Sequence, residues 1–203
     1  MKKFSLQVSL AAVLVLAAIG SAAAQSGFIA QTFVFDPGHL GISDSQWQPG
    51  TGLPDAGKSN HGLFLTKFGP TAALAASGAS IKGVNGITLS TLGFDVRNDG
   101  WCGAGAPRYN VTLADGTGFY FFFGCAYGIH TPVAGFPSWT RVRFTDADAF
   151  PADGVSAWPG FGTAEVAAID LIFDEGTDVG PGFTFVDNLA INSTLIGKPG
   201  NAK

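Results

Sequence analysis

Short apolar runs, separated by glycine, proline, asparagine and aspartate, make up most of the chain after its first residues. The runs are rich in aromatic and β-branched side chains, which is typical of β-strands joined by tight turns, and they show no apolar stripe at helical spacing. The pattern predicts an all-β fold, a two-sheet antiparallel β-sandwich that is jelly-roll-like. The expected strands are residues 28–35, 62–68, 87–96, 108–114, 117–124, 138–145, 164–173 and 183–192.

The strongest local signal is a hairpin around Asp115-Gly116, which separates the runs 108–114 and 117–124. If these two residues form the whole loop, Val111 lies opposite Tyr120. The second strand is then apolar on both faces, which favours a position in the middle of a sheet that is covered on both sides.

The run 138–145 alternates between two sets of side chains. One face holds Trp139, Arg141 and Arg143, and the other holds Thr140, Val142 and Phe144. Because successive strand residues point to opposite faces, we expect the second, more apolar set to face the core and the first set to face solvent.

The segments between these runs are predicted as turns and loops. Residues 38–60 are rich in glycine, serine, proline and aspartate, with Trp47 alone among them as a large aromatic, so we expect a long surface loop. Residues 71–79 are alanine-rich, which leaves a brief helical turn open there. We expect the strands 164–173 and 183–192 to pair as a hairpin with a long loop.

The N-terminus has the three-part layout of a secretory signal. Lys2 and Lys3 precede an almost wholly apolar run, Leu6–Ile19, and small residues follow it up to Ala24. Because this run is shorter than the about 20 residues of a membrane-spanning helix, we expect cleavage after Ala24 rather than retention as an anchor. The predicted organisation is a signal peptide at residues 1–24, a single β-sandwich domain at residues 25–196 and a polar tail at residues 197–203.

Export would place the mature protein outside the cytoplasm, secreted or in a periplasm, with no membrane span after cleavage. Loss of Lys2 and Lys3 would change the formal charge from −4 to −6. Nucleic acids and anionic membranes are bound mainly through clustered lysine and arginine side chains, which this acidic chain lacks, so we expect neither as a partner.

Two cysteines, Cys102 and Cys125, precede and follow the predicted hairpin. In an oxidising compartment, an even number of cysteines favours a disulfide. A free buried pair and a metal site are the alternatives, and the metal site is less favoured because the sequence offers no histidine pair nearby. A bridge would close a loop of about 20 residues and stabilise the fold by about 3 kcal/mol in the chain-entropy model.

The sequence points to no particular reaction. It contains neither a G-x-S-x-G elbow nor an H-E-x-x-H helix. Its two glutamates, Glu165 and Glu175, form no closely spaced acidic pair of the kind that cleaves glycosidic bonds, although aspartates could take that role. The three histidines, His39, His61 and His130, are far apart among turn-forming residues, which favours exposed loop positions over catalysis.

The run Phe183-Thr-Phe-Val-Asp-Asn-Leu-Ala-Ile-Asn192 resembles the closing strand of galactose-binding-like jelly rolls and many carbohydrate-binding modules, where aromatic residues lead into an Asp-Asn or Asp-Asp pair. In that family, the matching acidic residue often joins a structural calcium site with residues near the first strand. The resemblance therefore implies a jelly roll, a carbohydrate ligand and structural calcium held by Asp187, with Asp36 as a weaker candidate. Calcium prefers several oxygen ligands, but turn formation and solvation are the alternative roles for these acids.

Two groups of outward side chains are candidates for a binding surface. The first is Trp139 with Arg141 and Arg143, and the second is Arg108 with Asn110 on the predicted hairpin, beside several phenylalanines. Aromatic rings stack on the C–H faces of sugars, while polar side chains hold the hydroxyl groups. The alternative is that Trp139 caps the core and the arginines keep the surface soluble.

These observations favour a secreted, non-catalytic β-sandwich that binds a polysaccharide, a cell-surface glycan or another component of the cell envelope. One other hypothesis is an enzyme that acts on polysaccharides through aspartates. Another is a structural envelope or matrix protein without a small ligand, which predicts a large exposed apolar patch rather than a groove.

Overall fold

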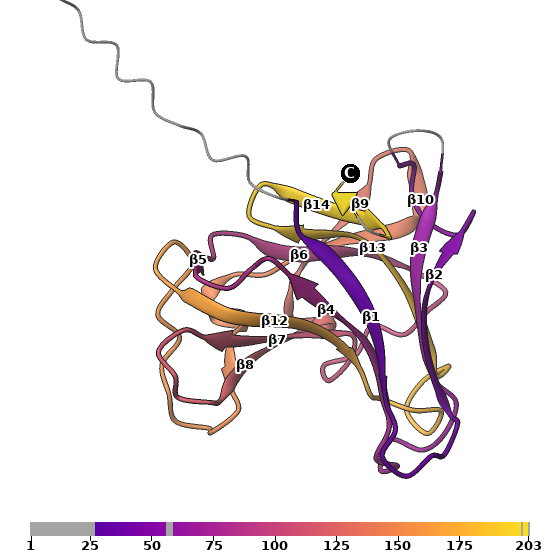
Figure 1. Ribbon diagram of the computed structural model, residues 1–203. Coiled ribbons are helices and arrows are strands. Elements are labelled where there is room, and N and C mark those ends of the chain that lie inside the picture. The colour runs from indigo at the N-terminus through magenta and orange to yellow at the C-terminus, as the bar shows by residue number, and fades with distance from the viewer. Residues whose placement is uncertain (1–26, 56–58, 200, 203) are drawn as a thin grey trace, which may run out of the picture.

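The computed structural model describes residues 27–55, 59–199 and 201–202, and the predicted signal peptide lies outside them. The described residues form two antiparallel β-sheets that pack face to face (Figure 1). The prediction of an all-β, two-sheet antiparallel sandwich is therefore confirmed.

The first sheet has seven strands in the described chain, in the order β1-β4-β12-β7-β8-β11, with β5 paired to β12. Their bounds are β1 Ile29–Phe35, β4 Ala76–Lys82, β5 Ile87–Thr88, β7 Arg108–Leu113, β8 Tyr120–Gly124, β11 Phe150–Pro151 and β12 Glu165–Phe173. Two short 3₁₀ helices, Cys125–Tyr127 and Asp146–Asp148, follow β8 and precede β11.

The second sheet has eight strands in the described chain, in the order β15-β14-β13-β6-β10-β9, with β3 paired to β13 and β2 paired to β3. Their bounds are β2 Ser43–Pro49, β3 His61–Lys67, β6 Leu92–Arg97, β9 Ile129–Val133, β10 Phe136–Arg143, β13 Phe183–Ile191, β14 Thr194–Lys198 and β15 Asn201–Ala202.

Several pairs of consecutive strands are divided between the two sheets. β3 and β4, β6 and β7, and β12 and β13 each place one member in each sheet. β12 lies between β4 and β7, and β13 lies between β3 and β6, so this last long pair occupies the interior of both sheets. Crossings of this kind occur in Greek-key sandwiches and agree with the jelly-roll-like expectation.

The core lies between the sheets and is rich in aromatic rings. Phe94, Tyr109, Phe123 and Phe144 are all buried, and neighbouring ring centroids among them lie 5.6 to 6.2 Å apart. The Tyr109 hydroxyl donates a hydrogen bond of 3.0 Å to the carbonyl of Gly93, and burial raises the pKa of this tyrosine above its usual range. Burial of each such side chain contributes about 1.5 to 3 kcal/mol, so these rings hold the two sheets together.

The β7–β8 hairpin forms as predicted, but its register differs. Val111 pairs with Phe121 rather than with Tyr120. Gly116 and Gly118 in the connecting loop have φ angles of 77° and 74°, so the turn needs two glycines and is longer than the predicted two residues.

This shift of one residue exchanges the two faces of β8. Phe121 and Phe123 are fully buried, whereas Tyr120 and Phe122 are half-buried on the outer face. β8 is also not a central strand, because its second neighbour is the two-residue strand β11. Residues 119–123 are all aromatic, so their own pattern does not specify a face, and the alternation of β7 decides it.

The segment predicted as a long surface loop, residues 38–60, contains the strand β2. All seven residues of β2 pair with β3. Trp47 is half-buried, and its indole N–H donates a hydrogen bond of 3.2 Å to the carbonyl of Ala30. The prediction was wrong because β2 is a polar edge strand, whose side chains have the composition of a loop.

β12 and β13 do not form the predicted hairpin. They lie in opposite sheets, so the connecting segment 174–182 crosses from one sheet to the other. The apolar faces of the two strands meet across the core, where Leu171 and Phe173 of β12 and Val186 and Leu189 of β13 belong to one buried cluster. β12 and β13 therefore contact each other through side chains packed in the core, and not through backbone hydrogen bonds within one sheet.

Two smaller segments also differ from expectation. Residues 71–74 form turns, and β4 begins at Ala76, so the alanine-rich segment 71–79 is divided between a turn and a strand. Lys198 ends β14, and residues 201–202 form β15, so strand structure extends into the predicted tail.

Candidate functional site

A row of six side chains crosses the outer face of the seven-stranded sheet, one from each strand along its path. We call it the cross-strand row, and its members in spatial order are Gln31, Ser80, Asp170, Asn110, Phe122 and Phe150. Each is exposed or half-buried, whereas their sequence neighbours Ala79, Ile81, Leu171 and Val111 are buried in the core. Neighbouring strands are about 4.8 Å apart, so the row is roughly 24 Å long.

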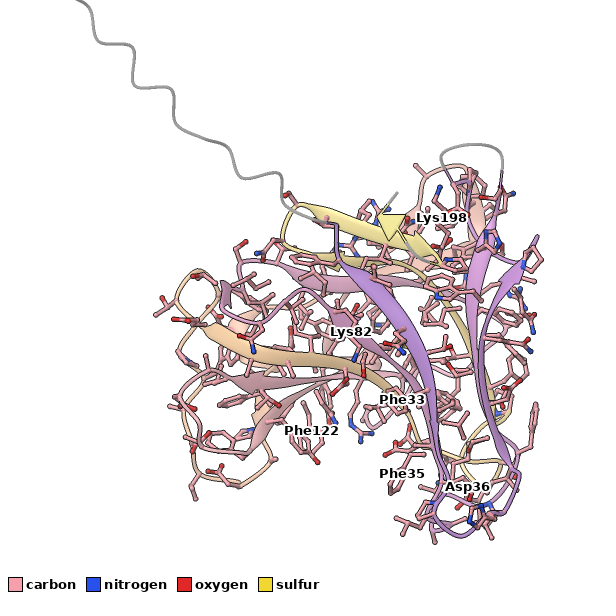
Figure 2. The ribbon with its side chains drawn as sticks, viewed as in Figure 1. Phe33, Phe35, Asp36, Lys82, Phe122 and Lys198 are labelled. Carbon is pink, nitrogen blue, oxygen red and sulfur yellow. A yellow bond between two sulfur atoms is a disulfide. The ribbon has the colours of Figure 1, made fainter. Side chains whose placement is uncertain are left out.

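A second line of residues lies beside the row on the same face. Phe33 is opposite Gly78, Ile172 is also opposite Gly78, and Arg108 is opposite Ile172. A Cβ atom at Gly78 would overlap the Leu171 carbonyl oxygen and lie 2.7 Å from the ring of Phe33, so the backbone of β12 and this ring together leave no room for a side chain on β4. Figure 2 shows Phe33 on β1 and Phe122 toward the other end of the sheet. Aromatic groups therefore flank the polar centre of the face.

Arg108 is held firmly on this face. Its guanidinium forms an ion pair with Asp174, with an Nη2 to Oδ2 distance of 2.8 Å, and donates to the Gly105 carbonyl at 2.7 Å. Its Nε donates to Asn110 Oδ1 at 3.0 Å, and its Cζ lies 5.2 Å from the centroid of the Phe122 ring. These contacts orient two members of the cross-strand row.

Two cavities open near Arg108, and both are lined by Gly105. The larger cavity has a volume of about 400 Å³ and is lined by Phe35, Lys67, residues 71–76, Gly105, Asp174 and Glu175. The smaller cavity has a volume of about 210 Å³, and its lining includes Gly105, Arg108, Phe122, Tyr127 and Phe150. The rings of Tyr127 and Phe150 are exposed and have centroids 4.7 Å apart, so the smaller cavity has an aromatic wall.

Residues 103–106 lie between the two cavities, and we call them the bridging loop. The predicted disulfide anchors this loop at the residue that precedes it, Cys102. Cys102 and Cys125 are bonded, which confirms the pairing. Glu175 Oε2 accepts hydrogen bonds from the indole of Trp101 at 2.6 Å and from the Ala106 amide at 2.9 Å. These bonds fix both ends of the loop.

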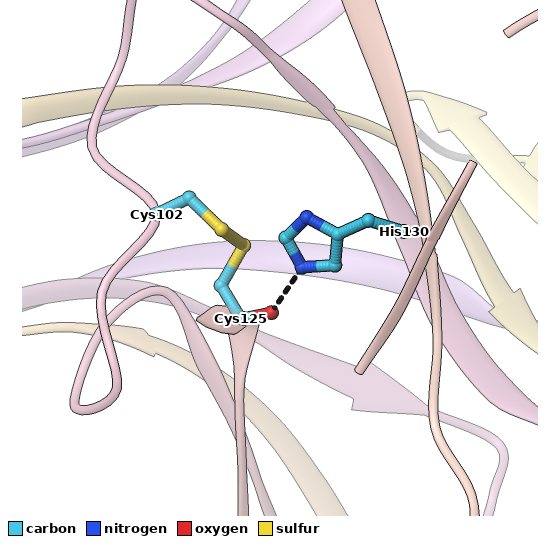
Figure 3. A group of neighbouring side chains, drawn as sticks. All are labelled: Cys102, Cys125 and His130. Atoms are coloured by element: carbon cyan, nitrogen blue, oxygen red, sulfur yellow. Dashed lines mark hydrogen bonds between the residues drawn. A yellow bond between two sulfur atoms is a disulfide. The ribbon is translucent and has the colours of Figure 1, made fainter. Parts of the chain in front are cut away.

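His130 lies beside the disulfide, as Figure 3 shows. Its Nε2 is 2.8 Å from the Cys125 carbonyl oxygen. The ring and the two sulfur atoms are the one cluster of three potential metal-binding groups in the described part of the chain. Because thiolate sulfur is the metal-binding form of cysteine, the disulfide leaves this cluster without its sulfur ligands.

Lys67 lies at the larger cavity and is almost completely buried, with 1% of its surface exposed. Its ammonium donates to the carbonyls of Thr71, Ala73 and Asp174 at 2.7 to 2.8 Å. Burial lowers the pKa of Lys67, although the charges of Asp174 and Asp178 act in the opposite direction. The lysine thus ties the loop after β3 to the end of β12.

Arg108 and Asn110, both predicted as binding residues, lie on this face. The other predicted residues, Trp139, Arg141 and Arg143, lie on the outer face of the opposite sheet, so the two groups do not form one platform. Trp139 is only 5% exposed and packs with Leu53, Val133 and Phe185. Its burial agrees with the alternative of a capping role and does not present a ring for stacking.

Arg141 and Arg143 are engaged by a buried carboxylate. Asp95 is 0% exposed and accepts hydrogen bonds from Arg141 Nε and Nη2, both at 3.0 Å. Arg143 Nη1 lies 3.5 Å from Asp95 Oδ1. The Asn188 side-chain amide donates a hydrogen bond of 2.7 Å to Asp95 Oδ2. The bond to Asp95 raises the pKa of Arg141, whereas burial lowers that of Arg143.

The two predicted calcium ligands have protein partners. Asp187 is completely buried, and its oxygens accept hydrogen bonds of 2.6 Å from the amides of Leu53 and Asn188. Asp36 lies at the end of β1 and accepts from the amides of Leu40 and Gly41, which lowers its pKa. Neither aspartate belongs to a cluster of three potential metal-binding side chains within the described residues, and calcium at Asp187 stays a prediction.

The opposite sheet also carries an aromatic patch, formed by Phe64, Phe68, Arg97, Pro181, Phe183 and Phe185 around a shallow hollow of about 340 Å³. Phe68 is 56% exposed. The Arg97 guanidinium stacks 3.5 Å from the centroid of the Phe185 ring and also pairs with Asp99. This patch is apolar, in contrast to the mixed aromatic and polar cross-strand row.

One further sequence motif was missed. Residues Gly52–Ser59 have the spacing of a phosphate-binding loop, G-x-x-x-x-G-K-S. Phosphate binding by that motif requires a strand before the loop and a helix after it, whose N-terminus receives the phosphate. Here the motif connects the antiparallel strands β2 and β3, and residues 56–58 lie outside the described chain. Its context therefore does not support phosphate binding.

Phe122, Phe150, Tyr127 and Phe33 are the aromatic site residues that the sequence did not reveal, and Gln31, Ser80 and Asp170 are the polar ones. Their positions on one face follow from strand register and sheet order. A correct hairpin register would have found Phe122, but no local signal places Phe150 or Phe33 beside it.

Comparison with protein-family models, with curated proteins and with solved structures found no match. Among the described residues, no helix is long and apolar enough to cross a membrane.

Proposed function

We propose that this protein is an exported, non-catalytic β-sandwich that binds carbohydrate on the outer face of its seven-stranded sheet. The observation that carries the proposal is the cross-strand row, in which polar side chains such as Asn110 and Asp170 lie between Gln31 at one end and the rings of Phe122 and Phe150 at the other. Sugars offer C–H faces to aromatic rings and hydroxyl groups to polar side chains, and the row provides both.

Preorganisation supports the same function. Arg108 is held by Asp174 and Gly105 and in turn orients Asn110, so this part of the face loses little conformational freedom when a ligand binds. The disulfide and the export signal expected from the sequence suit an extracellular or periplasmic location, and the resemblance of the last strand to galactose-binding-like modules suits a glycan ligand.

The polysaccharide-cleaving alternative finds less support on this face. Asp170 and Asp174 are four residues apart along extended chain, which places them about 13 Å apart. Glycosidases hold their two carboxyl groups roughly 5 to 9.5 Å apart. Asp174 is also ion-paired with Arg108. Asp95 and Asp187 are direct partners across β6 and β13, but both are completely buried and hence closed to a substrate.

The test is binding of the chain without its predicted signal to an array of polysaccharides and glycans. We expect a retained glycan, and a loss of affinity of about tenfold or more for Phe122→Ala and for Asn110→Ala, because central aromatic and hydrogen-bonding contacts dominate such sites. Phe68→Ala is the matched control, since it removes a ring of the aromatic patch on the opposite sheet.

Two results would count against the proposal. One is the absence of binding across the array. The other is an equal loss of affinity in Phe68→Ala with none in Phe122→Ala, which would move the function to the aromatic patch and favour a structural envelope protein that docks through an apolar surface.

A further inference from the structure

The two cavities beside Arg108 share one lining residue. Gly105 lines both the larger and the smaller cavity, and the guanidinium of Arg108 binds its carbonyl. Because glycine has no side chain, only backbone atoms of residue 105 lie between the two cavities. A Cβ atom there would lie 2.6 Å from Glu175 Oε1, so this position is tight against the acid that holds the loop.

The bridging loop is held in place by the adjacent disulfide and by hydrogen bonds at both of its ends. The disulfide anchors its beginning, the Gly103 amide bonds the Ala106 carbonyl at 2.7 Å, and Glu175 holds the Ala106 amide. The Ala126 amide, from the segment after β8, bonds the Gly103 carbonyl at 3.0 Å. The division between the cavities is therefore a fixed part of the surface, which lowers the conformational cost of binding a ligand across it.

The charged groups of the two cavities already have partners. The ammonium of Lys67 is surrounded by three carbonyls, Arg108 is paired with Asp174, and Glu175 accepts two N–H groups. A charged ligand would lose its hydration without gaining a counter-charge, which is costly in a partly buried site. The chemistry of the cavities therefore favours an uncharged ligand.

The two cavities offer different surfaces. The smaller one presents the exposed rings of Tyr127 and Phe150 together with Phe122, which suit the C–H face of a sugar ring. The larger one is lined by the exposed apolar side chains of Phe35 and Leu74 and by the other residues of the segment 71–76. A single sugar ring can occupy one cavity, but only a chain of linked sugars reaches both.

We propose that the larger and smaller cavities are two subsites for one uncharged oligosaccharide chain, which passes over the bridging loop at Gly105. This inference rests on the proposed function and adds the ligand class, which is an extended neutral chain rather than a terminal sugar or a polyuronate.

The experiment is titration calorimetry with neutral cello-, xylo- and malto-oligosaccharides from the monosaccharide to the hexasaccharide, and with polygalacturonate as the charged chain. In the series that binds, we expect affinity to rise by about tenfold or more from the shortest bound member to the longest, because the second cavity adds its own contacts. Polygalacturonate should bind more weakly than the neutral chain.

Variants at the two ends separate the subsites. Phe150→Ala and Tyr127→Ala change the smaller cavity, and Leu74→Ala and Phe35→Ala change the larger one. All four side chains are exposed, so we expect their removal to leave the fold intact. Each variant should lose affinity for long chains and flatten the dependence on chain length, whereas Phe68→Ala should leave both unchanged.

Affinity that does not depend on chain length, or variants that matter at one cavity only, would overturn the two-subsite inference while leaving carbohydrate binding in place. Tighter binding of polygalacturonate than of any neutral chain would overturn the assignment of an uncharged ligand. If neither these probes nor the glycan array is bound, the proposed function itself fails.

Discussion

Arg108 and Asp174 form a bidentate ion pair that joins the start of β7 to the residue immediately after β12. The Arg108 side chain is 12% exposed and that of Asp174 is 35% exposed, so the pair is partly shielded from water. The same guanidinium binds Gly105 and Asn110. One ion pair thus connects the cross-strand row to the boundary between the two cavities.

We expect Asp174→Asn to lower the free energy of unfolding by about 1 to 2 kcal/mol, because it leaves a half-buried guanidinium with a weaker partner. Urea denaturation measures this change. Asp99→Asn is the control, since Asp99 pairs with Arg97 in a similar two-pronged manner but is 59% exposed, and its loss should cost about 0.5 kcal/mol or less. Equal losses for the two variants would show that the Arg108 pair has no special structural role.

Lys67→Met should destabilise the protein by about 3 to 5 kcal/mol, because it leaves three carbonyl groups without their shared donor. Thermal and urea unfolding give the magnitude. Lys82→Met is the matched control, because Lys82 is exposed at the end of β4, and this variant should stay within about 0.5 kcal/mol of the native protein. A Lys67 variant as stable as the control would contradict a structural role for the buried ammonium.

Replacing both cysteines by alanine should lower the free energy of unfolding by about 3 kcal/mol, since the bridge joins residues 23 positions apart and restricts the unfolded chain. Comparison of unfolding with and without a reductant checks this value. The reductant should destabilise the native protein and leave the Cys102→Ala, Cys125→Ala variant unchanged. If the reductant lowers the stability of both proteins equally, its effect does not come from the disulfide.

Asp178 provides a pH dependence at Thr71, a residue that lines the larger cavity. Its Oδ1 accepts hydrogen bonds of 2.7 Å from the hydroxyl and the amide of Thr71, which lower its pKa below the ordinary value of 3.8. A carboxyl group with a lower pKa in the folded state stabilises the fold above its unfolded pKa, and this contribution is lost as the pH falls through the folded value. We therefore expect the Thr71 segment to loosen only below about pH 3.8.

The measurement is an NMR titration of the Thr71 amide resonance, which should move with a midpoint below 3.8. A local resonance is needed because Asp36, Asp99 and Asp153 also have lowered pKa values and titrate in the same range. Asp178→Asn keeps an oxygen acceptor but removes the ionisation, so its Thr71 resonance should no longer titrate. A midpoint at or above the ordinary value would contradict the assignment.

The positions of the longer apolar strands and the disulfide could be predicted from the sequence, because they depend on local patterns and on the number of cysteines. β3, β12 and β13 begin and end within one or two residues of the predicted runs, and the pairing of Cys102 with Cys125 follows from an even number of cysteines. β2 was missed because an edge strand needs no apolar face, so nothing in its composition separates it from a loop.

Only part of the candidate site could be predicted from the sequence. Arg108 and Asn110 were found because β7 alternates clearly between polar and apolar residues. Phe122 was assigned to the wrong face, because a run of five aromatic residues has no alternation of its own. Trp139 was expected at the surface from its place in an alternating strand, but Leu53 and Phe185, distant in sequence, pack against it and bury it.

Side-chain periodicity and composition are enough to predict that this chain forms β-strands, roughly where its apolar strands lie and that its two cysteines pair. Gln31, Asp170 and Phe150 are separated along the chain, and their place in one row on one face follows from strand order and register in the folded protein. Strand order and register depend in turn on the burial of whole sheet faces against each other. That long-range condition also determines which of two apolar neighbours, such as Phe121 and Phe122, enters the core and which remains at the surface.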